Sequence, residues 1–277
     1  MLKACIIGYP VAHSRSPIIH RHWLATHAID GSYIHEEVKP ENFASFVKSM
    51  PHNGFVGGNV TIPHKTSLLS LAAHRTKEAE AAGAANTLWF ENGQPCVDNT
   101  DIKGFLANLD AAVDGWDKQA ETAVVLGAGG ASRGIIYGLL QRGFSRIILS
   151  NRTYSASEAL VKIFGKAVTA VHWRETERWL SDADLLVNTT SLGMIGQPPL
   201  ELHLANLPAY AVVTDAVYVP LETPLLTQAR LRGLRTVGGL GMLLHQAVPG
   251  FERWFGIQPC VTSHLTRLIE ADVECGH

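Results

Sequence analysis

The sequence contains few cysteines and no concentration of charge of one sign. None of the four cysteines among its 277 residues forms a Cys-x-x-Cys pair, so neither a zinc framework nor a disulfide scaffold is indicated, and a reducing compartment fits. Lys and Arg number 23 against 25 Asp and Glu, which gives a net charge of -2. Because neither sign gathers into a long run, we expect no nucleic acid partner and no binding to an anionic membrane surface.

Long apolar runs are also absent. No stretch approaches the roughly 20 apolar residues of a membrane span, and the apolar run before Tyr9-Pro10 is too short for a signal peptide. We therefore expect a soluble cytoplasmic protein. Hydrophobic residues make up 46% of the chain, and at about 150 residues per domain its length predicts two domains, each with its own core.

Short apolar runs alternate with helical segments in the first hundred residues, a rhythm typical of β-α units. Ser16-Pro17 predicts a helix start at which the Ser16 hydroxyl acts as the cap, and Pro40 predicts a second start. Asn92-Gly93 predicts a hairpin turn or tight connection, and the polar segment 110–121 indicates a boundary. The strands expected before that boundary are 4–8, 33–38, 54–62, 87–90 and 96–98.

A glycine-rich turn follows the apolar strand expected at 122–126. It reads Gly127-x-Gly129, with Ser132 where the dinucleotide-binding fingerprint prefers Gly or Ala, and a helix and a strand at 146–150 come next. Glycine also serves plain tight turns, but this context favours a loop whose N–H groups face a pyrophosphate. Further strands expected at 168–171, 184–188 and 211–215, with helices between them, predict a doubly wound sheet. Final helices near 241 and 261 are expected to pack elsewhere.

The end of the second strand of this unit indicates the cofactor. An acidic residue there holds the ribose of NAD, whereas a basic one accommodates the extra phosphate of NADP. The sequence offers no acid but Asn151-Arg152-Thr153, so NADP is preferred, the alternative being that Arg152 is a solvated surface arginine.

Lys65 and Asp101 each follow an expected strand and lie among small polar residues. A lysine ammonium beside a substrate carbonyl can donate the proton that a hydride transfer requires, and an aspartate can orient it. The alternative is a surface salt bridge. Ser14 and Ser16 could both donate to a carboxylate, although helix capping would also explain Ser16. The N-terminal histidines show no metal-binding motif, so no metal is expected.

Several motifs, taken in order, resemble the shikimate dehydrogenase family over essentially the whole chain. They are Ser14-Arg15-Ser16-Pro17, Asn59-Val60-Thr61-Ile62-Pro63-His64-Lys65, Gly83-Ala84-Ala85-Asn86-Thr87, Asn99-Thr100-Asp101, Gly127-Ala128-Gly129-Gly130-Ala131, Asn151-Arg152-Thr153, Asn188-Thr189-Thr190, Asp215-x-x-Tyr218-x-Pro220 and Gly239-x-Gly241-Met242-Leu243-x-x-Gln246. The resemblance implies reversible, NADP-dependent reduction of 3-dehydroshikimate to shikimate in aromatic amino acid biosynthesis. It implies an α/β fold of two domains: a substrate domain at 1–104 plus 241–277, to which the C-terminal helices return, and a Rossmann-type NADP domain at 105–240.

The resemblance also implies roles for individual residues. Lys65 and Asp101 would be the catalytic pair. The substrate would be bound by Ser14, Ser16, Thr61, Asn86, Tyr218 and Gln246. The cofactor would be bound by Gly127, Ala128, Gly129, Gly130, Ala131, Asn151, Arg152, Thr153, Thr189, Val217, Gly239 and Met242. The sequence departs from relatives with a strong NADP preference at Ala156, where they often carry a second basic residue.

Two other functions remain open from the sequence. A quinate/shikimate dehydrogenase would accept a broader range of substrates or NAD, and a non-catalytic sensor would bind a dinucleotide or a shikimate-like ligand to regulate a partner. A sensor has no need of a proton donor, so the presence of both Lys65 and Asp101 favours an enzyme. The expected partners are a small-molecule substrate and NADP, and the expected assembly is a monomer or homodimer.

Overall fold

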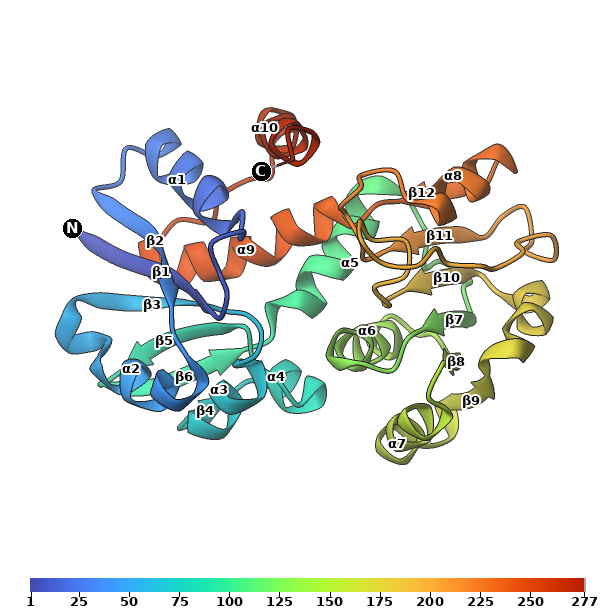
Figure 1. Cartoon of the computed structure of the whole chain (residues 1–277), viewed down its shortest axis with the longest axis horizontal. Helices are drawn as coiled ribbons and strands as arrows, with labels where there is room; N and C mark the ends of the chain where they lie inside the picture. Colours follow the sequence, from blue (N-terminus) through green and yellow to red (C-terminus); the bar gives the residue numbers. More distant parts are fainter. Residues whose placement is uncertain (277) are drawn as a thin grey trace. The chain divides into compact units, whose positions relative to one another are not determined.

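The computed structural model describes residues 1–276, which divide into two compact units (Figure 1). The first unit comprises Met1–Gly104 and the segment from Leu243 onward, and the second comprises Phe105–Met242. The divisions fall inside helices α5 (Thr100–Ala112) and α9 (Leu240–Phe255) rather than in the polar segment 110–121. That segment is no linker because Val113 and Trp116 are buried in the core of the second unit.

The first unit contains a mixed six-stranded sheet in the order β2-β1-β3-β5-β6-β4. Strands β2, β1 and β3 run parallel, and β5 pairs antiparallel with both β3 and β6. The predicted hairpin is confirmed, with Asn92 and Gly93 at φ values of 51° and 74°, the left-handed pair that a two-residue turn requires. The strands are β1 (Leu2–Gly8), β2 (Gly31–Glu37), β3 (Phe55–Val60), β4 (His74–Arg75), β5 (Thr87–Glu91) and β6 (Gln94–Asp98).

The helix after the first strand begins where expected but is not capped as expected. Ser16 is the first helical residue, and the capping position is Arg15, whose side chain makes no cap hydrogen bond. The Ser16 hydroxyl is therefore not used as a cap. Pro40 begins a short 3-10 turn, and the α-helix follows from Phe43. The helices of this unit besides α5 and α9 are α1 (Ser16–Thr26), α2 (Phe43–Ser49), α3 (Lys65–Leu71), α4 (Lys77–Ala82) and α10 (Ser263–Glu274).

The C-terminal helices complete the core of the first unit. Trp254 on α9 is buried and donates a hydrogen bond from its indole Nε1 to the Leu88 carbonyl on β5, at 2.9 Å. The same indole leaves no room for a side chain at position 57 on β3, because a Cβ on Gly57 would lie 2.3 Å from the Trp254 Nε1 atom. Trp23 on α1 donates to the Cys260 carbonyl before α10, at 3.1 Å. The expectation that these helices pack away from the second sheet is thus met for the part that follows Leu243.

The second unit contains a six-stranded sheet that is parallel throughout, in the order β12-β11-β10-β7-β8-β9. This is the doubly wound order: β7, the first strand of the unit, lies in the middle, β8 and β9 are added on one side of it, and β10, β11 and β12 are added on the other side. The strands are β7 (Thr122–Leu126), β8 (Arg146–Asn151), β9 (Val168–His172), β10 (Leu185–Asn188), β11 (Val212–Asp215) and β12 (Arg235–Val237). The helices are α6 (Gly130–Gln141), α7 (Tyr154–Phe164) and α8 (Pro224–Leu231).

The expected helices between the later strands are partly wrong. The segment between β9 and β10 is a 3-10 helix, Trp173–Asp182, and the described residues 189–211 between β10 and β11 contain no helix. Gly193 and Gly196 in that loop have φ values of 86° and 80°, and two prolines follow at 198–199, which together prevent a continuous helix. Strand β12 was not expected because three residues give no usable pattern.

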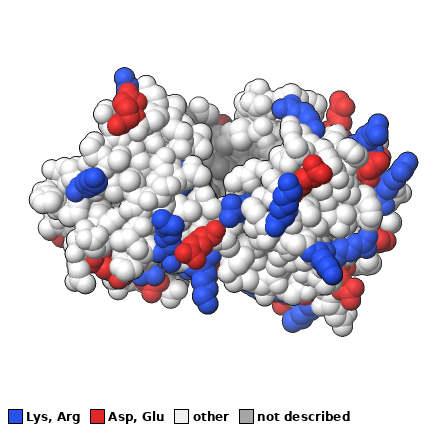
Figure 2. All heavy atoms as spheres, turned by 90° about the horizontal axis from the view of Figure 1, so that it is seen from below, with Lys and Arg blue, Asp and Glu red and all other residues white. Residues whose placement is uncertain are grey.

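Strand β7 shows why this sheet is buried on both sides. Its side chains alternate between two hydrophobic clusters, with Ala123 and Val125 in one and Val124 and Leu126 in the other. A run of five buried residues is the pattern of a parallel strand covered on both faces. On the face that Figure 2 shows, Lys and Arg side chains lie beside Asp and Glu, without a continuous patch of one sign. Among residues 1–276, no helix is long and apolar enough to cross a membrane.

Candidate active site

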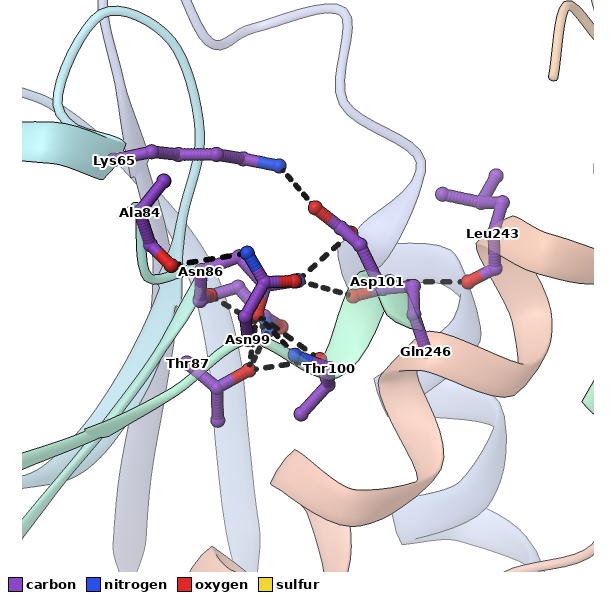
Figure 3. Close-up of polar contacts among 10 residues, drawn as sticks. Lys65, Ala84, Asn86, Thr87, Asn99, Thr100, Asp101, Leu243 and Gln246 are labelled. Atoms are coloured by element: carbon purple, nitrogen blue, oxygen red, sulfur yellow. Dashed lines mark hydrogen bonds and ion pairs between the residues drawn. The ribbon is translucent and has the colours of Figure 1, made fainter. Parts of the chain in front are cut away.

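Lys65 and Asp101 are adjacent in the first unit although 36 residues separate them in the sequence. Lys65 is the first residue of α3, shortly after β3, and Asp101 lies in the first turn of α5, directly after β6. The Lys65 Nζ atom lies 2.6 Å from Asp101 Oδ2, as Figure 3 shows. Their side chains are 31% and 22% exposed, so a ligand can reach both. The carboxylate orients the Lys65 ammonium group through this ion pair.

Asn86 joins this pair to helix α9. Its Nδ2 atom donates to Asp101 Oδ1 at 2.8 Å and to Gln246 Oε1 at 3.3 Å (Figure 3). Gln246 in turn donates from Nε2 to the Leu243 carbonyl at 3.0 Å. Asp101 therefore accepts a hydrogen bond on each carboxylate oxygen. Asp101 at the start of α5, Asn86 in the turn before β5 and Gln246 on α9 form one cluster of polar side chains.

Thr61 and the two serines follow strands of the same sheet. Thr61 is half-buried after β3, with its backbone N–H bonded to the Ile7 carbonyl at 2.9 Å. Ser14 lies in the loop after β1 and Ser16 is the first residue of α1, with their hydroxyl oxygens 3.3 Å apart. Two hydroxyls this close can donate to the two oxygens of one carboxylate.

Arg15, between the serines, is bound to the C-terminal helix. Its Nε atom lies 2.7 Å from Asp272 Oδ2 on α10, and its side chain is 10% exposed. The carboxylate of Asp272 thus neutralises the positive charge of Arg15, which lies between Ser14 and Ser16.

The glycine-rich loop of the second unit has the form of an anion cradle. Gly127 has a φ of 104°, and a Cβ there would lie 2.6 Å from Thr189 Oγ1, so only glycine fits against the end of β10. Gly129 and Gly130 face open space, since a Cβ on either would meet no atom within 4 Å. Gly129 is the capping residue of α6 and offers no side chain to the N–H groups of its first turn. These N–H groups fit a pyrophosphate.

Asn151 connects this loop to the end of β8. Its Oδ1 atom accepts from the Ala128 N–H at 3.2 Å, and its Nδ2 atom donates to the Thr153 carbonyl at 2.9 Å. Arg152 and Thr153 are exposed beside it. Among the described residues, no hydrogen bond or ion pair engages the Arg152 guanidinium. Arg152 therefore offers an unpaired positive charge next to the glycine-rich loop, which suits the 2′-phosphate on the ribose of NADP.

The remaining predicted cofactor residues follow the other strands at this edge of the sheet. Thr189 follows β10 and donates to the Leu126 carbonyl at 2.7 Å, and Val217 follows β11 with its N–H on Asp215 Oδ1 at 3.0 Å. Gly239 follows β12, and a Cβ there would lie 2.5 Å from the Ala216 carbonyl oxygen. Met242 packs against the core cluster of this unit. All lie beyond the carboxyl ends of parallel strands, where such sheets bind ligands.

Tyr218, predicted to help hold the substrate carboxylate, belongs to the second unit and is half-buried in the loop after β11. The other predicted substrate residues belong to the first unit. Asp215, at the end of β11, is buried, and burial raises the pKa of this carboxyl while the hydroxyl of Thr223, the N–H of Val217 and the amide of Asn188 oppose that shift. It fixes the loop that carries Val217 and Tyr218.

Three family models match the chain. They describe a shikimate dehydrogenase substrate binding domain at residues 6–88, a shikimate/quinate 5-dehydrogenase at 111–195 and a shikimate 5′-dehydrogenase C-terminal domain at 239–260. A relative named shikimate dehydrogenase (NADP(+)) from Mesorhizobium japonicum is 56% identical, over 98% of this chain and 96% of its own length. The chain belongs to the shikimate dehydrogenase family.

Solved structures of the shikimate dehydrogenase family agree with this fold. The shikimate 5-dehydrogenase from Thermus thermophilus, in complex with NADP(H) and shikimate, has a TM-score of 0.86 at 32% identity, covering 99% of this chain and 100% of that chain. The quinate dehydrogenase from Corynebacterium glutamicum, in complex with NAD, has a TM-score of 0.90 at 27% identity, covering 98% of this chain and 99% of that one. The predicted two-domain α/β fold is confirmed.

The sequence did not reveal all the polar side chains that surround Asn86 in this member of the shikimate dehydrogenase family. Asn59, Thr87 and Thr100 are buried and contact Asn86 through hydrogen bonds, yet none of them was assigned a role. Their only signal in the sequence is their place in the same short motifs as Lys65 and Asp101.

Proposed function

We propose that this protein catalyses the NADP-dependent, reversible reduction of 3-dehydroshikimate to shikimate. The observation that carries the proposal is the Lys65–Asp101 pair at 2.6 Å, held by Asn86 and Gln246 in a chain that is 52–56% identical to relatives named shikimate dehydrogenase (NADP(+)). This reaction belongs to the biosynthesis of aromatic amino acids.

The first unit binds the substrate in this proposal. Shikimate carries one carboxylate and several hydroxyls, and the unit offers neutral donors and acceptors beside the Lys65–Asp101 ion pair. Ser14 and Ser16 donate to the carboxylate, and Thr61, Asn86 and Gln246 bond the ring hydroxyls. Because Asp272 neutralises Arg15 at 2.7 Å, the carboxylate site rests on hydroxyl groups and not on a free cation.

Lys65 and Asp101 handle the proton. In the direction of reduction, the carbonyl carbon of the substrate gains a hydride and its oxygen gains a proton. Lys65 donates that proton from Nζ, and Asp101 orients the ammonium group toward the carbonyl oxygen. In the direction of oxidation, the same pair takes the proton from the hydroxyl as the carbonyl forms.

The second unit binds the cofactor, which supplies or accepts the hydride when it is bound. The N–H groups from Gly127 to Ala131 face the pyrophosphate, and Arg152 with Asn151 and Thr153 contacts the 2′-phosphate and the adenosine. Thr189, Val217, Gly239 and Met242 lie toward the nicotinamide end.

The test is a steady-state assay of the purified protein with shikimate and quinate, each offered with NADP+ and with NAD+. We expect fast turnover only with shikimate and NADP+. Comparable rates with quinate or NAD+ would assign the protein to the broader quinate/shikimate dehydrogenases. Binding of both ligands without turnover in any combination would instead identify a sensor.

A further inference from the structure

The amide of Asn86 is held in one orientation by donors behind it. Its Oδ1 atom accepts from the Thr100 backbone N–H at 2.8 Å, and the hydroxyls of Thr87 and Thr100 each lie 3.1 Å away (Figure 3). A flipped amide would set its NH2 group against the Thr100 N–H and its oxygen against the carboxylate of Asp101. Asn86 Nδ2 must therefore face Asp101 and Gln246.

Thr87 connects the side-chain amide of Asn86 to Asn59 on β3. Its hydroxyl donates to Asn86 Oδ1 and accepts from Asn59 Nδ2 at 3.3 Å. Asn59 in turn accepts on Oδ1 from the Tyr33 hydroxyl at 2.7 Å. Tyr33, Asn59 and Thr87 are almost completely buried, so water does not compete for these bonds.

The donors in this chain all point the same way. Tyr33 donates to Asn59, Asn59 to Thr87, Thr87 to Asn86, and Asn86 to Asp101, which also accepts from Lys65. Hydrogen bonds aligned in one direction polarise one another, and here the chain ends on a carboxylate. Three strands and two helices contribute to it, so the positions of buried groups on β2, β3 and β5 determine where Asn86 holds Asp101.

We propose that Thr87 is a positioning residue for the reaction and that Asn59 and Tyr33 fix its hydroxyl. Thr87 touches neither substrate nor cofactor, and it acts by holding the Asn86 amide against Asp101 and the substrate hydroxyl. This inference rests on the proposed function, because it assigns Thr87 a part in that same reaction.

The test compares Thr87→Val, which keeps the shape and removes the hydroxyl, with Thr87→Ser, which keeps the hydroxyl. We expect Thr87→Val to lower kcat/KM for shikimate about tenfold, the order of effect that the loss of one buried hydrogen bond gives. Its Kd for NADP+ should remain within about twofold of the wild-type value. Thr87→Ser should recover most of the activity. Thr176→Val is the matched control, because Thr176 is equally buried and bonded to Ser150 at 2.6 Å, but in the second unit.

A double mutant separates positioning from a general structural effect. If Thr87 acts through Asn86, adding Thr87→Val to Asn86→Ala should cost less than about twofold. The same tenfold loss in both backgrounds would overturn the inference, as would a Thr87→Ser variant as impaired as Thr87→Val. Should Thr87→Val fail to fold, Tyr33→Phe tests the same chain, and wild-type kcat/KM in that variant would refute the part assigned to Tyr33 and Asn59.

The same assay distinguishes the inference from the function on which it rests. A wild-type protein that does not oxidise shikimate with NADP+ contradicts the proposed function. An active wild-type protein with an equally active Thr87→Val variant contradicts only the role of Thr87.

Discussion

At the scale of the residue, Lys65 is the group to which we assign the proton transfer. Replacing it with alanine removes the proton donor and leaves the neutral groups that bind the substrate. We expect Lys65→Ala to lower kcat by two orders of magnitude or more, with a modest change in the Kd for shikimate. Stopped-flow or steady-state kinetics with a separate binding titration measure the two quantities. Unchanged turnover would remove Lys65 from the mechanism.

Arg152 is the residue that we propose selects between the two nicotinamide cofactors. It is the free cation at the end of β8, and Ala156 leaves no second basic side chain at the position where strongly NADP-selective relatives often have one. We expect Arg152→Ala to raise the KM for NADP+ at least tenfold and the KM for NAD+ less than threefold, because only NADP+ carries the 2′-phosphate. Equal losses with both cofactors would refute the phosphate assignment. The control is Arg267→Ala, because Arg267 is an exposed residue of α10.

At the scale of the element, helix α10 supports the serine loop. Its Asp272 is the partner of Arg15, which stands between the two serines, while its apolar face of Leu265, Ile269 and Val273 is buried. We expect Asp272→Ala to raise the KM for shikimate about tenfold with a smaller effect on kcat, because the loop that holds the carboxylate loosens. Asp272→Glu should recover part of the loss.

Glu274→Ala is the control for that helix, since Glu274 is exposed two residues further along. A KM for shikimate in Asp272→Ala that equals the value in Glu274→Ala would show that the ion pair does not support the loop. A parallel rise in the KM for NADP+ would instead indicate a general loss of structure.

The elements also show how far the sequence alone could lead. Hydrophobic pattern and turn residues predicted the strands around Gly127 and the hairpin at Asn92-Gly93, because local chemistry decides both. The Ser16 cap was wrong because the helix begins one residue earlier than a cap would require, and Pro17 occupies the first turn whether or not the serine caps. The Lys65–Asp101 bond was found because motifs placed both residues after strands, whereas the chain through Tyr33 is set by strand pairing that no local pattern reveals.

At the scale of the whole molecule, His20 links stability to pH. Its ring is fully buried, stacks on Tyr33 with 4.0 Å between ring centroids, and has no partner for either nitrogen within residues 1–276. Burial lowers the pKa of His20 from 6.5 to about 3, against an opposing contribution from Asn59. The folded protein therefore holds this histidine neutral at pH values where the unfolded chain protonates it.

The sign of the effect follows from proton binding. Below pH 6.5 the unfolded chain binds the additional proton, so stability falls as the pH decreases from about 6.5 toward 3. At pH 5 the loss assigned to His20 is about 2 kcal/mol of unfolding free energy relative to pH 8. We expect His20→Phe to reduce the pH dependence by about that amount in urea unfolding at the two pH values. The exposed His52→Asn variant should keep the wild-type dependence, and identical slopes in both variants would contradict the assignment.

The first unit is assembled from the two ends of the chain, with the whole second unit inserted between them. A ribosome therefore releases residues 1–104 long before α9 and α10 exist, although Trp254 and Phe251 must cover part of the sheet and helix α1. The second unit, whose core lies within 105–242, can close first. At about 5–20 residues synthesised per second, residues 1–104 wait on the order of ten seconds for α9 and α10. The part of the chain that is synthesised first therefore completes its core last, when α9 and α10 have been made.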